Sequence, residues 1–424
     1  MTPRNLFALA LLIAVVAGPP AREAAAQNPF LQNRGERTIE SIEFEGNTIT
    51  RDYVLRRALG FEVGDAYDSE AISEAWERLE RLPFIAYVDI ETNRSRPGVA
   101  DLLIVVEEDT RFAWAPGLEY SRAQGDGFHA LLDLKWTNLT GRAESLDLRV
   151  RGWNRRGARL MWQNPWILGP AKLGVYAATS YDAWDWQYDL GEGAPDEPVF
   201  SDWGFRAGVW RDFGPWVRVN LEAAWRELEL EDLGVQQDPR IRLSFEHDSR
   251  DARYYPNKGV VAHADLVSGG LNDGIENYLT ATFGLSNFTT LPRVDVIVAS
   301  HASYRAANEA LPFYERTYLG GPMNLRGLDF GSIAGDQAWR ASLELRRPII
   351  LLPLREGESI GLGVHVFHDW GAAFAHDAAL GDQDTRFSYG GGLHFNFKTR
   401  NFRFEWARTD DDETVFVFED TFHF

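Results

Sequence analysis

The end of the chain constrains its fold more than any other segment. In residues 412–424, four aromatic side chains share one face of a predicted strand and polar side chains share the other. The four are Phe416, Phe418, Phe422 and Phe424. Side chains alternate between faces along a strand, so this segment has one apolar and one polar surface. An exposed apolar edge invites aggregation in water, whereas a closed transmembrane barrel requires such strands. We therefore expect residues 412–424 to contain the last strand of a barrel.

The first 26 residues predict an export signal. Arg4 supplies positive charge, residues 6–17 are apolar, and residues 24–26 form an Ala-Ala-Ala cleavage site. A membrane anchor is the alternative, but the apolar run of about 12 residues is shorter than the roughly 20 that a helical span needs. We therefore expect a cleaved signal peptide at 1–26, followed by a short segment at 27–36.

Bulk composition narrows the class of protein. The chain has no cysteine, which excludes disulfides and fits an oxidising compartment. Its net charge of −20 disfavours nucleic acid as a partner, because phosphate contacts need cationic surface. The mean hydropathy of −0.31 would suit a soluble protein, but barrel strands keep every second residue polar. No cofactor is implied.

Residues 37–108 predict a small α+β module. Residues 38–44 alternate as a strand, and a short helix through Ala58 follows, capped by Thr50. A second helix begins near Asp68 and ends before Pro83, with four apolar residues on one face. These are Ile72, Ala75, Trp76 and Leu79. Strands at 85–91 and 101–106 complete the order β-α-α-β-β, which resembles a single POTRA domain; an unrelated α+β domain is the alternative.

Residues 110–424 lose the helical period and alternate instead, for example at 146–151, 387–397 and 402–407. We place about sixteen antiparallel strands there, which predicts a transmembrane β-barrel. If the first strand leaves the module, every even-numbered strand should end in a short periplasmic turn. The predicted turns are 138–141, 164–169, 213–216, 251–259, 290–292, 348–358 and 398–401. The long irregular stretches 182–200 and 306–337 fall in the opposite phase.

The segment 319–328 carries a resemblance to a known family. Its Gly320, Gly321, Arg326 and Gly327 are similar to the sixth-loop signature of the BamA/TamA/two-partner-secretion transporter superfamily, the bacterial surface antigen barrels. In that family the loop folds into the lumen and its Arg-Gly tip packs on the inner wall. Here Leu328 replaces the aromatic residue that usually follows the glycine.

Two later segments resemble the strands that receive this tip. Residues 366–371 are similar to the family's F-x-D-x-G strand and place Phe367, Asp369 and Gly371 on one face. Residues 342–346 resemble the preceding strand, with Glu344 pointing inward. The resemblance implies that Arg326 bonds Asp369 and Glu344, and a buried guanidinium does need carboxylate partners. An ordinary loop arginine is the alternative.

A further match lies at a periplasmic turn. Residues 245–259 resemble the family's D-x-R-D…P-x-x-G turn through five residues: Asp248, Arg250, Asp251, Pro256 and Gly259. A charged turn is favoured over a catalytic cluster there. The turn at 141–144 and the terminal Phe424 match as well.

Other polar groups suggest weaker hypotheses. His301 and Ser303 share a strand face, but no third member of a hydrolase triad accompanies them, so no enzyme is expected. The acidic loops 182–197 and 410–413 could bind divalent cations that bridge lipopolysaccharide, although a solvated acidic surface is favoured. The glycine run 390–392 indicates a bend or close approach in a strand.

The resemblance implies a bacterial outer-membrane protein with its POTRA-like domain in the periplasm. It would insert or assemble other barrels, using a seam between its first strand (112–120) and its last (414–424) to pair a client strand. The expected partners are membrane lipid and lipopolysaccharide, unfolded outer-membrane clients or a secreted polypeptide, and a periplasmic protein on the POTRA-like domain. A two-partner secretion pore and a specialised barrel without insertase activity are the alternatives. The first should carry two POTRA domains and a plug helix, and residues 27–37 are too short for a plug.

Overall fold

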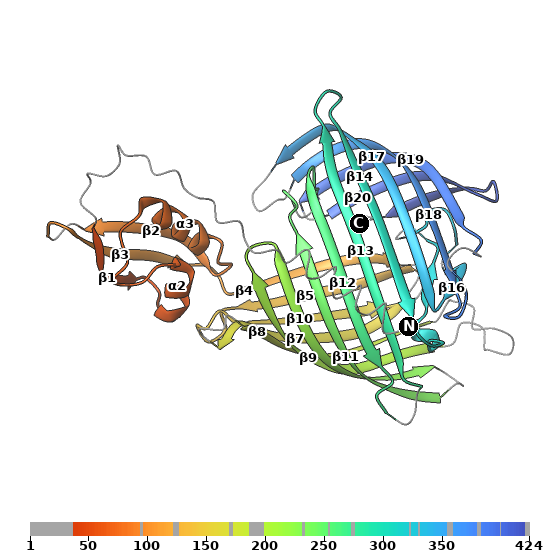
Figure 1. Ribbon diagram of the computed structural model, residues 1–424, viewed down its shortest axis with the longest axis horizontal. Helices are drawn as coiled ribbons and strands as arrows, with labels where there is room; N and C mark the ends of the chain where they lie inside the picture. The colour runs from red at the N-terminus through yellow and green to blue at the C-terminus, as the bar shows by residue number, and fades with distance from the viewer. Residues whose placement is uncertain are drawn as a thin grey trace. The chain divides into compact units, whose positions relative to one another are not determined.

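The structure is a computed structural model in which two compact units are distinguished (Figure 1). One ends at Arg111 and also takes in Thr140–Ala143; the other comprises Phe112–Leu139 and the chain from Glu144 onward. The residues described are 37–93, 96–121, 127–168, 173–185, 199–230, 234–252, 255–272, 276–321, 324–329, 331–353, 359–379, 383–398 and 400–419. The expected signal peptide and the segment 27–36 lie outside them.

The small unit contains a three-stranded sheet in the order β1-β3-β2, with β1 at Thr38–Glu45, β2 at Ile85–Asn93 and β3 at Val99–Glu108. The central strand β3 runs parallel to β1 and antiparallel to β2. Alternation along β3 buries Ala100, Leu102, Ile104 and Val106 on one face. This face forms the core together with the two helices.

The helices α2 (Asp52–Leu59) and α3 (Ser69–Glu80) contribute Leu55, Ala75 and Leu79 to that core. The predicted start of the second helix near Asp68 is confirmed, and Asp68 caps α3 by accepting a hydrogen bond from the Glu70 backbone N–H at 3.0 Å. The expected Thr50 cap on α2 is wrong. That helix has Arg51 at its N-cap position with no side-chain cap, and the Thr50 hydroxyl, one residue earlier, donates to Glu108 at 2.5 Å. In the described part of the chain, no helix has both the length and the apolar character of a membrane span.

The large unit is a single antiparallel sheet of sixteen strands, which confirms the predicted barrel class and strand number. In chain order the strands are β4 (Phe112–Ser121), β5 (Gly127–Thr137), β6 (Ser145–Trp153), β7 (Arg155–Leu168), β8 (Leu173–Asp185), β9 (Val199–Phe213), β10 (Val217–Leu230), β11 (Gly234–Asp248), β12 (Gly259–Gly269), β13 (Tyr278–Leu291), β14 (Val296–Ala307), β17 (Gln337–Pro353), β18 (Ser359–Phe374), β19 (Arg386–Lys398), β20 (Arg400–Thr409) and β21 (Thr414–Glu419). Each pairs with its neighbours in sequence.

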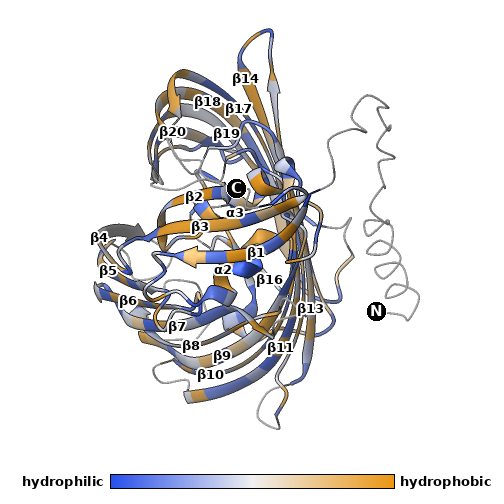
Figure 2. Ribbon diagram, turned by 90° about the vertical axis from the view of Figure 1, so that its left-hand side faces the viewer, coloured by the Kyte–Doolittle hydropathy of each residue, from blue (hydrophilic) through white to orange (hydrophobic). Residues whose placement is uncertain are grey.

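The two edges of this sheet are β4 and β21. Within the described residues, no hydrogen-bonded ladder joins these two strands. Hydropathy alternates along many of the strands (Figure 2), so that one face of the sheet is apolar and the other polar. The apolar face exposes large aromatic side chains, among them Trp114, Trp203, Trp406 and Phe416, as a lipid-facing surface requires.

As predicted, each even-numbered strand of the large sheet, counted from β4 as the first, is followed by a short connection, with two corrections to where these connections begin. Residues 164–168 are not a turn but continue β7, where the pairing with β8 shifts register between Asn164 and Leu168. Residues 348–353 likewise continue β17. The strand accommodates Pro348 because its pairing with β18 shifts register between Pro348 and Ile350. The long loop between β14 and β17 contains a short 3-10 helix, η3 (Phe313–Glu315), and the two-stranded ribbon β15 (Thr317–Leu319) and β16 (Ile333–Gly335).

Candidate functional site

The tip of the β14–β17 loop is a tight turn built on glycine. Gly320 (φ +115°), Gly321 (φ +90°) and Gly327 (φ +87°) all occupy left-handed backbone conformations that side chains rarely adopt. A Cβ at Gly320 would lie 1.9 Å from the Asp329 carbonyl oxygen. The Asn324 side chain closes the turn by accepting the Gly320 backbone N–H at 2.7 Å. This backbone presents Arg326 to the inner wall.

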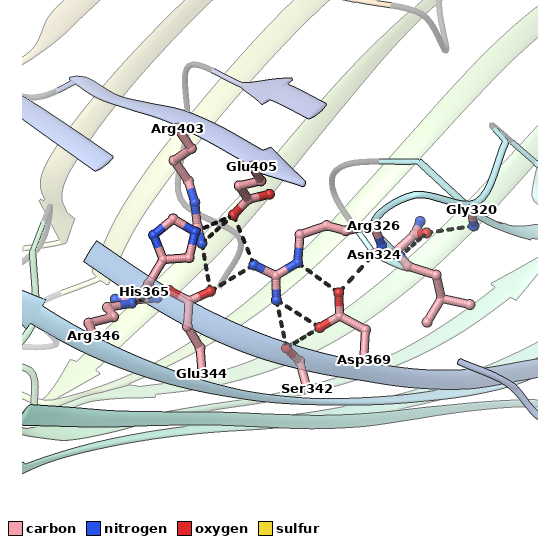
Figure 3. A network of polar contacts seen from close by, with 11 residues as sticks. Gly320, Asn324, Arg326, Ser342, Glu344, Arg346, His365, Asp369, Arg403 and Glu405 are labelled. Carbon is pink, nitrogen blue, oxygen red and sulfur yellow. Dashed lines mark hydrogen bonds and ion pairs between the residues drawn. The ribbon is translucent and has the colours of Figure 1, made fainter. Parts of the chain in front are cut away.

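Arg326 is completely buried and makes a bidentate ion pair with Asp369 (Figure 3). Its Nε donates to Asp369 Oδ2 at 2.7 Å, and its Nη2 donates to Asp369 Oδ1 at 2.8 Å. The Ser342 hydroxyl also donates to Asp369 Oδ1, at 2.5 Å. Such fork-to-carboxylate geometry is strong and directional, because both charged groups are planar.

Two glutamates complete the contacts of the guanidinium. Arg326 Nη1 donates to Glu344 Oε2 at 2.7 Å and to Glu405 Oε1 at 3.2 Å. Glu344 lies on β17, Asp369 on β18 and Glu405 on β20, so one loop residue contacts three strands of the wall. The sequence expectation paired Arg326 with Glu344 and Asp369, and the structure brings all three together.

Further charges surround these carboxylates. Arg346 Nε donates to Glu344 Oε1 at 2.5 Å, and Arg403 Nη2 lies 2.6 Å from Glu344 and 2.7 Å from Glu405. All of these side chains are nearly or fully buried. The cluster thus contains three arginines (326, 346 and 403) and three carboxylates (344, 369 and 405), whose charges balance. Pairing of this kind offsets the desolvation that a lone buried charge would suffer.

Glycines at the contact allow the loop tip to lie close against the wall. The Phe367 ring lies 3.4 Å below the Arg326 guanidinium carbon, a close cation–π contact. A Cβ at Gly390 would lie 2.9 Å from that ring and 2.0 Å from the Trp406 carbonyl oxygen. Gly371 and Gly327 are also contact points: a Cβ on Gly371 would approach Leu319 and Leu325 at 3.3 Å, and one on Gly327 would reach Ala407 at 2.7 Å. Leu328 is buried beside Leu319 and Leu325, where an aliphatic side chain fits.

The same cluster includes the one described set of residues with metal-ligand geometry, Glu344, His365 and Glu405, whose ligand atoms lie within 4.8 Å of one another. Guanidinium groups already occupy both carboxylates. Their positive charge opposes a cation at the same place. The arrangement therefore fits a network of ion pairs better than a metal centre.

A hydrogen-bonded chain connects this network to the turn between β11 and β12. His365 Nε2 contacts Glu405 at 2.7 Å, His365 Nδ1 contacts His394 Nδ1 at 3.1 Å, and the Tyr255 hydroxyl contacts His394 Nε2 at 3.0 Å. Tyr255 lies in the turn, and burial raises the pKa of its hydroxyl to about 12. The phenol therefore stays protonated as a hydrogen-bonding group.

The five residues expected at that turn shape it. Asp248 accepts hydrogen bonds from the Arg250 backbone N–H at 3.1 Å and from its side chain at 2.7 Å. Asp251 accepts the Lys258 backbone N–H at 3.1 Å. Gly259 (φ +114°) allows Ser249 to approach, and Pro256 is buried. These contacts match a structural turn.

The remaining expected residues lie elsewhere. Phe416 and Phe418 are exposed on the apolar face of β21, whereas Phe422 and Phe424 are outside the described residues. His301 lies 2.9 Å from the hydroxyl of Ser286 on β13. In the acidic loop 410–413, Asp410 and Asp411 pair with Arg386.

Sequence reasoning missed five members of the network. These are Ser342, Arg346, His365, Arg403 and Glu405. A signal was available for Arg403 and Glu405, because they alternate with Phe402, Phe404 and Trp406 and so point inward. Alternation identifies the face but not which inward charges meet.

Comparisons with known proteins find matches to both units of the chain. Residues 138–424 match the model of the Omp85 superfamily domain, and residues 37–109 match POTRA, described as a surface antigen variable number repeat. The sorting and assembly machinery component 50 homolog of Bos taurus is 24% identical over 369 residues, covering 79% of this chain and 75% of that protein. The outer membrane protein assembly factor BamA of Nitratidesulfovibrio vulgaris is 22% identical over 321 residues, covering 72% of this chain and 39% of that protein.

Two solved structures share the fold. BamA from Haemophilus ducreyi lacking POTRA domains 1–3 superposes with a TM-score of 0.73 at 18% identity, covering 91% of this chain and 84% of that one. CdiB from Acinetobacter baumannii superposes with a TM-score of 0.59 at 16% identity, covering 91% and 73%. At these identities the likeness concerns the fold alone.

Proposed function

Because the chain belongs to the Omp85 superfamily, we propose that it inserts or assembles other β-barrel proteins in a bacterial outer membrane, with its POTRA domain in the periplasm. One observation carries the proposal. The sheet ends on β4 and β21, and within the described residues no ladder joins these two edges. A free edge offers unpaired N–H and C=O groups, which can pair with a strand of a client.

The composition of β4 supports a seam that opens. Pro116 lies in the middle of this strand, and Gly117 follows it. Proline cannot donate to a ladder, and glycine weakens a strand interior, so both are typical of edges. Both features weaken any ladder that β4 forms at this seam.

The buried network supports a role for the loop. We assign Arg326 as a lock that holds the β14–β17 loop against β17, β18 and β20. The strands nearest the β21 edge carry this network: β17, β18 and β20 supply its carboxylates, and β19 supplies His394 of the connected hydrogen-bonded chain. The lock would keep that side of the barrel rigid while the seam opens. The free energy for insertion would come from client folding, with no cofactor.

The partners follow from this role. They are membrane lipid and lipopolysaccharide around the barrel, unfolded outer-membrane proteins at the seam, and a periplasmic protein on the POTRA domain. The names of two relatives, a sorting and assembly machinery component and an outer membrane protein assembly factor, support this class of partner.

A seam-locking experiment tests the proposal. The chain has no cysteine, so a pair of cysteines introduced in β4 and β21 forms the only possible disulfide. The protein is reconstituted in liposomes, and folding of a urea-denatured barrel client is followed by its heat-modifiable gel shift. Acceleration by the reduced protein that disappears on oxidation is expected. Equal acceleration in both states would contradict the seam, and a single-cysteine variant controls for the oxidant.

A polypeptide-secretion pore is the second candidate, because the fold is also that of CdiB. A pore predicts ion conductance in planar bilayers and no acceleration of client folding. A specialised barrel without insertase activity predicts neither.

A further inference from the structure

A second set of contacts holds the β14–β17 loop to strands other than those that contact Arg326. The carboxylate of Glu315, at the end of η3, receives three arginines from three strands. Arg226 Nη1 of β10 and Arg240 Nη1 of β11 each donate to Glu315 Oε1 at 2.8 Å, and Arg305 Nη2 of β14 donates to Oε2 at 3.4 Å. The Glu315 side chain is 11% exposed.

The three arginines differ in whether Glu315 is their one carboxylate partner among the described residues. Arg226 has a second carboxylate, Asp202 of β9, at 2.7 Å. Arg240 and Arg305 have no other carboxylate within ion-pair distance among the described residues. Loss of the Glu315 charge would therefore leave these two guanidiniums facing each other and Arg226. Clustered like charges repel in a partly buried site.

Apolar contacts accompany the ion pairs. Phe313, Tyr314 and Tyr318 of the loop pack against a buried cluster on the wall, formed by Trp184, Phe200, Leu228 and Leu230. The Phe200 and Phe313 rings meet edge to face with centroids 6.0 Å apart. The cluster lies on β8, β9 and β10, and β10 also supplies Arg226. This part of the loop is thus docked by both charge and packing.

The two docking sites use different parts of the wall. Glu315 contacts β10, β11 and β14, whereas Arg326 contacts β17, β18 and β20. A loop fixed at one point can pivot about it, and a loop fixed at two points cannot. We propose that Glu315 is a positioning residue whose three-arginine contact fixes the loop so that Arg326 meets its carboxylates. This inference deepens the insertase proposed above and rests on it only for its effect on activity.

Loop position can be measured without any client. Spin labels are introduced at Ala334→Cys in β16 and at Glu229→Cys in β10, both exposed positions in a cysteine-free chain. The interspin distance distribution is then recorded for the reconstituted protein with and without Glu315→Gln. Because a charged hydrogen-bonded contact is lost, we expect the undocked population to rise about tenfold and the distribution to widen.

Glu309→Gln is the matched control. Glu309 lies in the same loop, and the same substitution removes one negative charge where no ion pair is present among the described residues. It should leave the distribution unchanged. An identical distribution in Glu315→Gln and Glu309→Gln would overturn the proposal.

A double-mutant cycle separates a specific contact from a general loss of structure. Arg240→Gln removes one partner and should widen the distribution less than Glu315→Gln does. The double variant should resemble Glu315→Gln alone, because the contact is already lost, and Glu315→Asp should partly restore the narrow distribution. Additive effects would contradict the assignment. If Glu315→Gln failed to fold, as judged by heat modifiability, Arg240→Gln would carry the same test.

The same proteins are then assayed for client folding. A slower rate for Glu315→Gln than for Glu309→Gln is expected. Loop widening without any insertase activity in the unmodified protein would sink the proposed function and leave the second docking site intact. If the unmodified protein accelerated client folding but Glu315→Gln left the distance distribution narrow, the second docking site would be refuted and the proposed function would stand.

Discussion

Arg326 and Asp369 lie 43 positions apart in the chain, and they form a bidentate ion pair in which both side chains are fully buried. Asp369 also accepts a hydrogen bond from the Ser342 hydroxyl. Glu344 differs, since Arg346 and Arg403 also contact it. Loss of Arg326 would therefore remove the bidentate pair from Asp369, whereas Glu344 would keep contacts with two other guanidinium groups.

Replacement of Arg326 by Ala should abolish or strongly reduce client folding while the barrel still forms. Removing one partner of a buried ion pair costs about 3–5 kcal/mol, which destabilises the docked loop, whereas the sixteen-strand ladders do not need the loop. Client folding rates and heat modifiability measure the two effects. Arg242→Ala is the control, because its pair with Asp265 is partly exposed and contributes at most about 1 kcal/mol. Normal client folding in Arg326→Ala would sink the proposed lock.

Replacement of Gly392 by Ala should destabilise the barrel through overpacking. A Cβ there would lie 2.0 Å from the Phe404 carbonyl oxygen and 2.8 Å from the Glu405 Cα, both backbone atoms. We expect a loss of about 1–3 kcal/mol in the free energy of unfolding. Urea titration followed by tryptophan fluorescence measures it. Gly152→Ala places the same methyl group where nothing lies within 4 Å and should be nearly neutral, so equal losses would refute the argument.

Replacement of Tyr255 by Phe should loosen the β11–β12 turn. It removes the hydroxyl that lies 3.0 Å from His394 and keeps the buried ring. The loss of one hydrogen bond costs about 1 kcal/mol, more where the partner stays buried. Hydrogen exchange in the segment 249–258 should quicken. Tyr389→Phe on the exposed face should leave this segment unaffected, and unchanged exchange in Tyr255→Phe would count against the hydrogen-bonded chain.

The stability of the POTRA domain should depend on pH through the ionisation of Glu108. Burial raises the pKa of this carboxyl, but hydrogen bonds from Thr50, Thr48 and Ile49 outweigh it and hold the pKa below its usual 4.5. A lowered folded-state pKa stabilises the fold above the unfolded-state value, and this stabilisation is lost as pH falls through the folded-state pKa. Hydrogen exchange at 46–52 should therefore be slower in the native protein than in Glu108→Gln at neutral pH. The difference should vanish in acid, and a difference that persisted there would contradict this role.

Much of the fold could be predicted because each element leaves a local signal. Period-two alternation located the strands, and turn residues at every second connection set their phase. Two predicted turns, 164–169 and 348–358, begin too early in the chain, and for a common reason. Pro165 and Pro348 are turn signals, but these strands keep their pairing through a shift of register beside the proline. Sequence shows the proline and not the neighbouring strand that compensates for it.

The site was only partly predictable. The family motif pointed to Arg326, Glu344 and Asp369, which meet. Glu315 carries no motif, and its three arginines come from strands with many other inward charges. Which of these charges meet depends on the path of the loop across the lumen, and alternation within a strand contains no information about that path.

The order of residues along the chain gives the buried network a further meaning. Arg326 precedes Ser342, Glu344, Asp369 and Glu405, every group that neutralises or caps it. During synthesis and folding, the arginine must stay in contact with water until β17, β18 and β20 have paired. Its burial therefore requires that β17, β18 and β20 have come together, so docking of the loop belongs to a late stage in the folding of the protein's own barrel.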